Sequence, residues 1–220
     1  MASAPAIRTR LSREDRMAQT LTAAHALFAE RGFAAVTMED IAAEVGVTKP
    51  LLYNYFGNKE RLYIACMERS GDALFATIGD AVGGTESPGD ALNAGLRAFF
   101  AFLDADRAAW AVLFDETLPQ SGEVADRVAV YRGRILEQVA GSLLAQMPEK
   151  RRSAARVEVE ALSTALLGAA EALARWWLLT EALSAQDAAE LLISTMEPGL
   201  RKRSAPASKA RSKQTGGDRA

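Results

Sequence analysis

The residues best suited to recognition chemistry gather in one short segment, TMEDIAAEVGVTKPLLYNYF, at positions 37–56. Its second half combines hydroxyl groups, a carboxamide, an ammonium group and tyrosine rings: Thr48, Lys49, Tyr53, Asn54 and Tyr55. Such groups donate hydrogen bonds to phosphate oxygens and to the edges of bases. The chemistry that this segment favours is therefore the non-covalent recognition of nucleic acid.

Two short helices must position these side chains. Thr37 is expected to be the N-cap of the first, Asp40 to complete a capping box, and Gly46 to end it. Thr48 is expected to cap the second helix, and Pro50 is tolerated in its first turn. Two short helices joined by a tight turn form a helix-turn-helix layout. A helical hairpin inside some other all-α domain has the same spacing, so spacing alone leaves both interpretations open.

An earlier helix should supply the surface on which this pair packs. It is expected to begin after Ser12 and to stop at Gly32. Ile41, Val45 and Leu52 have the spacing needed to pack the pair against it. The three helices together predict a small helical domain that presents the polar side of its third helix.

Residues for metal or nucleophilic chemistry are scarce. The single histidine, His25, is interpreted as structural, and the single cysteine, Cys66, as a small core residue. Asp115 or Glu116 could serve a helical enzyme as acid or base, but no convergent pair of carboxylates is visible. We expect no catalytic residue, no metal and no cofactor. A helical enzyme and an interaction module without DNA binding remain the alternatives.

Composition and charge exclude several classes of protein. The 220 residues are 49% hydrophobic, and no apolar run reaches the ~18 residues of a membrane-spanning helix. The N-terminus lacks the apolar core of a signal peptide, so we expect a cytoplasmic protein without membrane contact. The net charge of −2 combines an acidic middle with a basic C-terminal end, which leaves room for a localised DNA-binding surface.

The whole chain reads as an all-α protein of about nine helices, because alanine and leucine are abundant and apolar residues recur at helical spacing. The glycine-rich segment at 83–89 is expected to be the loop between two domains. The expected parts are a flexible arm (1–12), a DNA-binding domain (13–73), a second helical domain (85–200) and a disordered basic tail (204–220).

The stretch from Leu21 to Met67 resembles the DNA-binding domain of the TetR family of transcriptional regulators. The matching pairs and segments are Ala24–Phe28, Gly32-Phe33, Ile41-Ala42, Gly46-Val47, Leu52-Tyr53, Tyr55-Phe56 and Lys59-Glu60. This resemblance implies a homodimer, usually a repressor, with an N-terminal domain that binds a palindromic double-stranded operator. A C-terminal domain would bind a small effector and form the dimer.

The resemblance also implies which residues touch DNA. The recognition helix would carry Thr48, Lys49, Pro50, Leu51, Tyr53, Asn54 and Tyr55. Thr37 and Lys59 fall where family members commonly contact phosphates. Many members have glycine or a small polar residue in place of Pro50-Leu51, so Leu51 could instead pack on a thymine methyl group. Arg8, Arg10 and the basic tail could add DNA contacts, or could simply be flexible ends.

The second domain offers a surface for dimerisation. The helix expected at 153–182 carries a stripe of small residues, and the helix expected at 185–197 a complementary face: Ala161, Ala165, Gly168, Ala172; Ala188, Leu191, Leu192, Thr195. Glycine within a helix costs ~1 kcal/mol relative to alanine, which calls for a packing reason. We predict a four-helix dimer interface, with packing inside one subunit as the alternative.

Aromatic residues with few charges among them predict a ligand cavity in the same domain. Its candidate lining is Phe99, Phe102, Trp110, Phe114, Tyr131 and Trp177. Such a lining favours a largely apolar effector, either acyl-CoA-like or drug-like. The segment AFFAFLDADRAAWAVLFDE resembles actinobacterial family members that sense fatty-acyl compounds. Ordinary core packing would use these aromatic residues equally well.

Overall fold

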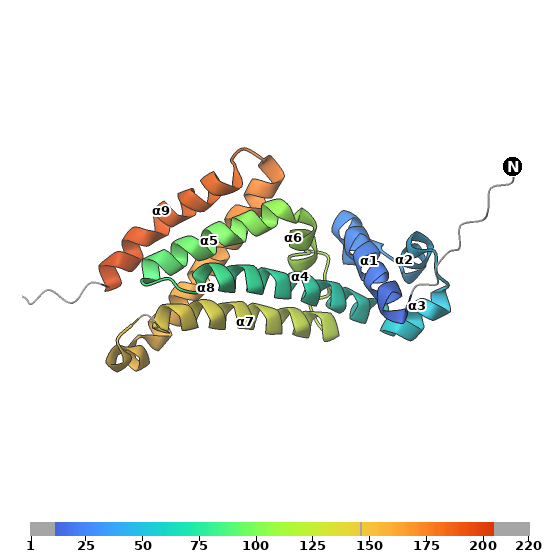
Figure 1. Ribbon diagram of the computed structural model, residues 1–220, viewed down its shortest axis with the longest axis horizontal. Coiled ribbons are helices and arrows are strands. Elements are labelled where there is room, and N and C mark those ends of the chain that lie inside the picture. Colours follow the sequence, from blue (N-terminus) through green and yellow to red (C-terminus); the bar gives the residue numbers. More distant parts are fainter. Residues whose placement is uncertain (1–11, 146, 205–220) are drawn as a thin grey trace, which may run out of the picture.

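The computed structural model describes residues 12–145 and 147–204, and its regular elements there are all α-helices, which confirms the expected fold class (Figure 1). In chain order they are α1 (Arg13–Ala35), α2 (Met38–Val45), α3 (Lys49–Phe56), α4 (Lys59–Val82), α5 (Pro88–Ala105), α6 (Arg107–Leu113), α7 (Glu123–Ala145), α8 (Glu149–Thr180) and α9 (Ala185–Ser204). The expected arm and tail fall outside the described residues, apart from Ser12 and Ser204.

Helix starts near the N-terminus follow the capping signals of the sequence. Ser12 and Asp15 form a capping box at α1, and Thr37 and Asp40 form another at α2. Each box satisfies two backbone donors that the first turn leaves without partners. Gly46 adopts a left-handed conformation, with φ of 70°, and ends α2 as predicted.

Two helix ends differ from the prediction. Gly32 does interrupt α1, with φ of 76°, but the chain resumes helical conformation after it and α1 extends to Ala35. The last helix was expected to end at residue 197, whereas α9 runs through Pro198 to Ser204. Proline disfavours a helix interior because it removes one hydrogen bond and crowds the preceding turn, but here it does not end the helix.

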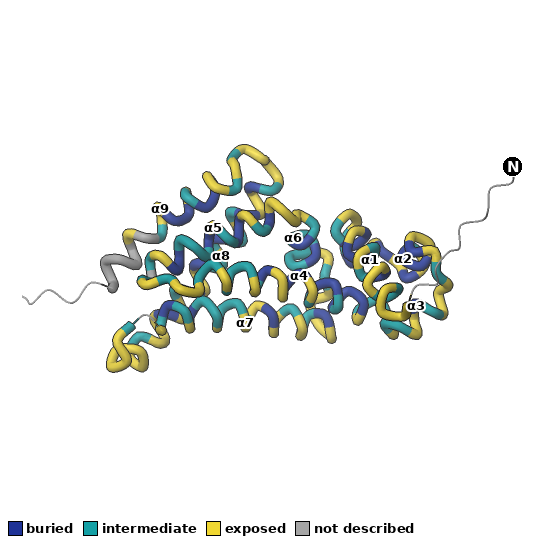
Figure 2. Tube along the Cα trace, viewed as in Figure 1, coloured by how far each residue is buried: buried dark blue, intermediate teal, exposed yellow. Residues whose placement is uncertain are grey.

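The helices α1–α3 pack around the first part of α4. Ile41, Val45 and Leu52 are buried there, which confirms the predicted packing of the helix-turn-helix pair. Figure 2 shows buried positions, in dark blue, in α1, α2 and α4 at this end of the molecule. Tyr63 of α4 meets Phe28 and Phe33 edge to face, with ring centroids 4.9 and 5.1 Å apart. Such aromatic pairs add to the stabilisation from burial alone.

The same core continues into the second half of the chain. The Tyr63 hydroxyl donates to the carbonyl oxygen of Val112 in α6, at 2.5 Å, and burial raises the pKa of that phenol. Val112, with Val124 and Tyr131 of α7, belongs to the same buried cluster as the α1–α3 residues. The N-terminal helices are therefore tied to the rest of the protein by packing as well as by the chain.

The helices α5–α9 form a bundle around the second part of α4, which extends from the α1–α3 end into the bundle (Figure 1). Helix α5 packs against both α4 and α9, and α7 packs against α8 and α4. Phe100 and Trp177 lie at the centre of this core, with ring centroids 5.7 Å apart. None of the helices in the described parts of the chain has the length and apolarity needed to cross a bilayer.

His25 and Cys66 both lie in the core between α1 and α4. His25 Nε2 is 2.9 Å from the hydroxyl of Ser70, and burial lowers the pKa of the imidazole. The Cys66 thiol lies 3.6 Å from the carbonyl oxygen of Leu21, and burial raises its pKa to about 12. Both residues act as parts of the α1–α4 contact.

Candidate nucleic-acid interface and ligand cavity

Helix α3 is held by one buried side chain and leaves its other side open. Leu52 is completely buried, and α3 packs against α2 and α4. The opposite side of the helix carries most of the residues proposed for DNA contact, and these are exposed: Thr48, Lys49, Pro50, Tyr53 and Asn54. Leu51 and Tyr55 are half-buried at its edges. Tyr53 is 41% exposed, so much of this residue is open to a partner.

Thr48 occupies the N-cap position of α3, but its side chain does not make the expected capping hydrogen bond. With Pro50 in the first turn, one of the amides that a cap would satisfy is already missing. Thr48 is exposed at the helix N-terminus, where the aligned peptide dipoles favour an anion.

Lys49 forms an ion pair with Glu39 of α2, and its ammonium group lies 5.7 Å from the centre of the Tyr53 ring. Their hydrogen bond raises the pKa of Lys49 and lowers the pKa of Glu39. Glu39 did not figure among the sequence-based site residues, and its position in the first turn of α2 was the available signal. An exposed carboxylate next to the recognition surface repels phosphates and competes for the lysine.

Thr37 and Lys59 make contacts within the protein. The Thr37 hydroxyl donates to the Asp40 carboxylate at 2.6 Å, as part of the α2 cap. The Lys59 ammonium donates to the carbonyl oxygen of Phe33 at 2.9 Å and lies 4.3 Å from the centre of the Phe33 ring. A phosphate at either residue would share these groups with their present partners.

Arg13 lies beside the recognition helix, although the sequence analysis did not include it among the site residues. Its guanidinium carbon is 5.5 Å from the centre of the Tyr55 ring, which brings the start of α1 next to α3. This contact explains why Tyr55 is half-buried. It also adds an exposed cation to the surface that α3 presents.

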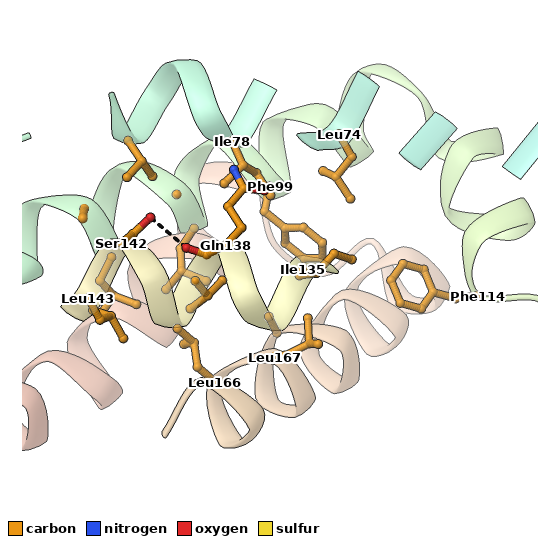
Figure 3. Close-up of a pocket in the computed structure, with 17 residues that line it drawn as sticks. Leu74, Ile78, Phe99, Phe114, Ile135, Gln138, Ser142, Leu143, Leu166 and Leu167 are labelled. Carbon is orange, nitrogen blue, oxygen red and sulfur yellow. Dashed lines mark hydrogen bonds between the residues drawn. The ribbon is translucent and has the colours of Figure 1, made fainter. Parts of the chain in front are cut away.

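A cavity of about 90 Å³ lies among α4, α5, α7 and α8. Its lining is almost entirely apolar, and Figure 3 shows Leu74, Ile78, Phe99, Ile135 and Leu166 around it. Among the described residues that line it, Gln138 and Ser142 of α7 carry the polar side chains. Ser142 donates a hydrogen bond to the Gln138 carbonyl at 2.9 Å.

The predicted cavity residues divide into three groups. Phe99 and Phe114 line this cavity, and Phe114 and Tyr131 line a smaller adjoining one. Phe102, Trp110 and Trp177 belong to the α5–α9 core instead. Trp177 is fixed there because its indole N–H donates to the carbonyl oxygen of Leu183 at 2.8 Å. The α4 side chains of the lining, Leu74, Ile78 and Val82, were not among the residues that the sequence analysis proposed.

The proposed dimer residues also divide. The small residues of α8 all face outward and are exposed: Ala161, Ala165, Gly168 and Ala172. On α9, Leu191 and Thr195 are exposed, whereas Ala188 and Leu192 are buried within the same chain. Ala188 and Leu192 lie on the side of α9 that packs against α5, so they are not available to a second subunit.

The carboxylates considered for an enzyme have structural partners. Asp115 accepts a hydrogen bond from the amide of Phe33 at 2.6 Å. Glu116 forms an ion pair with Arg175 of α8. The two groups point to different partners and do not form the convergent pair that general acid and base catalysis would need.

Comparison with known proteins gives the same assignment for both halves of the chain. Residues 21–66 match the family described as bacterial regulatory proteins, tetR family. Residues 88–197 match the family described as tetracyclin repressor-like, C-terminal domain.

Three relatives illustrate the similarity. The HTH-type transcriptional activator FasR of Mycolicibacterium smegmatis is 36% identical over 55% of the chain and 55% of FasR. The HTH-type transcriptional repressor KstR2 of Mycobacterium tuberculosis is 34% identical over 46% of the chain and 50% of KstR2. The chain thus spans about half the length of these curated relatives. The crystal structure of a TetR-like transcriptional regulator from Rhodococcus sp. RHA1 superimposes with a TM-score of 0.71 and 32% identity, covering 87% of this chain and 99% of that one.

Proposed function

Because the chain belongs to the TetR family of bacterial regulatory proteins, we propose that it is a homodimeric, sequence-specific DNA-binding regulator whose operator affinity depends on an apolar ligand. The observation that carries this proposal is the exposed polar side of α3, fixed from behind by the buried Leu52. A short rigid helix with hydroxyl, amide and ammonium groups on its free side fits the major groove. Such a regulator acts on chromosomal DNA in the cytoplasm.

On the DNA side, base edges and phosphates would be shared among different residues. Asn54 can read adenine through its carboxamide, Leu51 can pack on a thymine methyl group, and Tyr53 can reach a phosphate or a base edge. Lys49 would exchange its Glu39 partner for a phosphate or a guanine. The DNA backbone around these contacts would be held by residues at the ends and edges of the same surface: Thr37, Thr48, Pro50, Tyr55 and Lys59.

A dimer would place two copies of α3 in successive major grooves. The exposed side of α8 offers the surface for this dimer, because its small residues let a second helix approach closely. A Cβ at Gly168 would meet no atom of another segment within 4 Å among the described residues, so no packing seen there accounts for the glycine. Large apolar residues flank the small ones on the same side: Val157, Trp176 and Leu179.

On the ligand side, the cavity favours an apolar chain or ring system. Seventeen residues line it, and the two polar ones lie one turn apart on α7. A molecule with one polar group, such as an acyl ester or amide, could bond to Gln138 or Ser142 and bury its apolar remainder against α4, α5 and α8. An acyl chain is the ligand class that these surroundings suit best.

The direction of regulation is proposed as repression, released by the ligand. The activator FasR and the repressor KstR2 show that relatives of similar identity work in both directions. The same DNA-binding surface serves either role, because the position of the operator relative to the promoter decides the outcome. Activation is therefore the second candidate.

The proposal is tested by gel-shift titration of the purified protein on the promoter region next to its own gene. We expect salt-dependent binding, and we expect Tyr53→Ala to weaken it about ten- to hundredfold, since a good contact to DNA contributes ~1–3 kcal/mol. Tyr53→Phe keeps the ring. Its DNA affinity should lie between those of the wild type and Tyr53→Ala if the hydroxyl contacts DNA. Equal binding by the wild type and Tyr53→Ala, both folded by circular dichroism, would contradict the placement of the DNA surface.

A further inference from the structure

The loop between α6 and α7, residues 114–122, touches both the cavity and the DNA-binding helices. Its first residue, Phe114, lines the cavity and lies at one end of the lining residues in Figure 3. The next residue, Asp115, turns the other way. One carboxylate oxygen accepts a hydrogen bond from the backbone amide of Phe33 at the end of α1, at 2.6 Å.

The loop makes a second hydrogen bond to α1. The Thr117 hydroxyl oxygen lies 3.3 Å from the amide nitrogen of Ala34 and accepts its hydrogen bond. The other oxygen of Asp115 accepts from the Thr117 amide at 2.7 Å, which fixes the two acceptors relative to each other. Two consecutive backbone amides of α1 are thus held by two side chains of one loop.

The break at Gly32 makes these amides available. A positive φ of 76° interrupts the helical path there, so the amides that follow lack the regular acceptors four residues earlier. Space also favours glycine, because a Cβ at position 32 would lie 3.0 Å from the Thr117 hydroxyl oxygen and crowd that side chain. The kink and the loop therefore fit one another.

From Phe33 the contacts continue toward the recognition helix. Its carbonyl oxygen accepts from the ammonium group of Lys59, the first residue of α4, which follows α3 after a two-residue turn. Its ring packs against Phe28 and Tyr63 in the core behind α3. A shift of the Phe33 backbone would move both of these attachments.

The other side of the loop is fixed to the walls of the cavity. Phe114 stacks on Trp110 of α6 with ring centroids 4.1 Å apart. Glu116 pairs with Arg175 of α8, the helix that supplies Leu166 and Leu167 to the lining. The loop therefore responds to any change in the position of Phe114 or of the neighbouring part of α8.

We infer that Asp115 is the positioning residue that couples the cavity to the DNA-binding helices: a ligand that displaces Phe114 moves Asp115, and Asp115 moves the end of α1. This inference rests on the proposed function. A regulator controlled by a ligand needs two states that differ in DNA affinity. In this inference, the two states differ in the position of the Asp115 carboxylate. Thr117 supports the same coupling through the Ala34 amide.

The test fills the cavity without an identified ligand. Ser142→Cys places a thiol in the lining, and hexyl methanethiosulfonate attaches an apolar six-carbon chain to it as a disulfide. The native Cys66 remains unmodified, because burial raises the pKa of its thiol to about 12. Mass spectrometry measures the occupancy. Hydrogen exchange at the Phe33 and Ala34 amides reports their hydrogen bonds to Asp115 and Thr117. Gel-shift titration reports DNA affinity.

We expect the label to speed exchange at Phe33 and Ala34 at least threefold and to change DNA affinity at least fivefold. In Asp115→Ala combined with Ser142→Cys, the label should change DNA affinity less than twofold. Thr117→Val, which keeps the shape and loses the acceptor, should reduce the label effect in part and is the second variant if Asp115→Ala folds poorly. Asp126→Ala removes an exposed carboxylate from the first turn of α7 and should leave the label effect unchanged.

Each outcome separates the inference from the proposed function. If the label changes DNA affinity by the same factor with and without the Asp115 carboxylate, the inference is wrong and ligand control stands. If the label leaves both exchange and DNA affinity unchanged, the inference and ligand control through this cavity both fail. If the protein binds no DNA at all, an unchanged exchange rate at Phe33 and Ala34 still overturns the inference.

Discussion

At the scale of single residues, the side chains proposed to contact DNA already have partners within the protein. Lys49 is held by Glu39, Lys59 by the Phe33 carbonyl, and Tyr55 lies under Arg13. In the proposed complex, these attachments would orient the side chains before DNA binds, which would lower the entropy lost on binding. They would also oppose binding, because each cation would have to share or leave its partner.

Glu39→Gln tests this balance directly. Removing the carboxylate frees Lys49 and removes a negative charge beside the phosphates, so affinity for random-sequence DNA should rise about three- to tenfold. The ratio of operator affinity to random-sequence affinity should fall, since phosphate contacts carry no sequence information. Fluorescence anisotropy with both duplexes at several salt concentrations measures this change.

Glu44→Gln provides the matched control, because it removes the same charge from an exposed position of α2 outside the Lys49 pair. It should raise the random-sequence affinity less than twofold. Equal effects of the two substitutions would mean that Glu39 acts only through the net charge of the domain.

The buried His25 predicts how stability depends on pH. Burial lowers its pKa below the ordinary value of 6.5, with Arg69 acting in the same direction and Asp106 against it. The unfolded chain therefore binds the proton more readily, and the free energy of unfolding should decrease as the pH falls below about 6.5. Urea unfolding between pH 7.5 and 5.5 measures this loss.

The matched variant is His25→Asn, which keeps a polar side chain near Ser70 and does not titrate. Its free energy of unfolding should change less with pH over this range than that of the wild type. A parallel pH dependence in the two proteins would assign the titration to other groups.

At the scale of helices, α8 is the element whose exposed side needs an explanation. The small and apolar residues from Val157 to Leu179 form one stripe on the side opposite the buried Leu166, Ala170 and Trp177. With a rise of 1.5 Å per residue, the stripe is about 33 Å long. Exposed apolar surface of this extent is typical of a contact with another chain.

Ala165→Glu should dissociate the proposed dimer. Two glutamates brought together in a close helix contact would repel each other and lose solvation, so the dimer dissociation constant should rise more than tenfold. Sedimentation velocity across a range of protein concentrations measures it. Ala101→Glu makes the same change at an exposed position of α5 and should leave the dimer intact; dissociation by both variants, or by neither, would place the interface elsewhere.

Local signals predicted the bounds of α2 well because its ends are defined by residues next to them in the sequence. The capping box of Thr37 and Asp40 and the left-handed Gly46 define α2 within a few residues, and both were visible in the sequence. The sequence predicted Thr48 as the N-cap residue of α3 but could not show that its side chain makes no capping hydrogen bond, because the position and the bond are separate features. The ion pair of Lys49 with Glu39 depends on how α2 crosses α3, which spacing does not give.

The cavity and the inner side of α9 were harder to predict, since both depend on packing between distant segments. Aromatic residues mark apolar surface but not empty space, so Trp177 and Phe99 looked equivalent in the sequence although only Phe99 lines the cavity. Small residues likewise permit another helix to approach closely, but they do not indicate which helix it is. Ala188 meets its own chain, whereas Ala165 is left exposed.

At the scale of the whole molecule, the proposed DNA surface of α3, the cavity and the α8 stripe belong to one set of packed helices. Figure 1 shows α3 at one end of the molecule and the α4–α9 bundle at the other. The cavity lies among α4, α5, α7 and α8, and the stripe on α8 is exposed. A two-fold axis through the α8 stripe would present two copies of α3 to the same face of a duplex. The spacing between them would then depend on the bundle that holds the ligand.

The most direct test of this account is selection of bound sequences from a pool of random DNA duplexes by the purified wild-type protein. We expect enrichment of an inverted repeat whose half-site centres lie about 34–36 Å apart, or a multiple of that, because two recognition helices reach successive major grooves. We also expect Tyr53→Ala to recover the repeat poorly or not at all. Enrichment of no sequence, or of a single site without two-fold symmetry, would contradict the account.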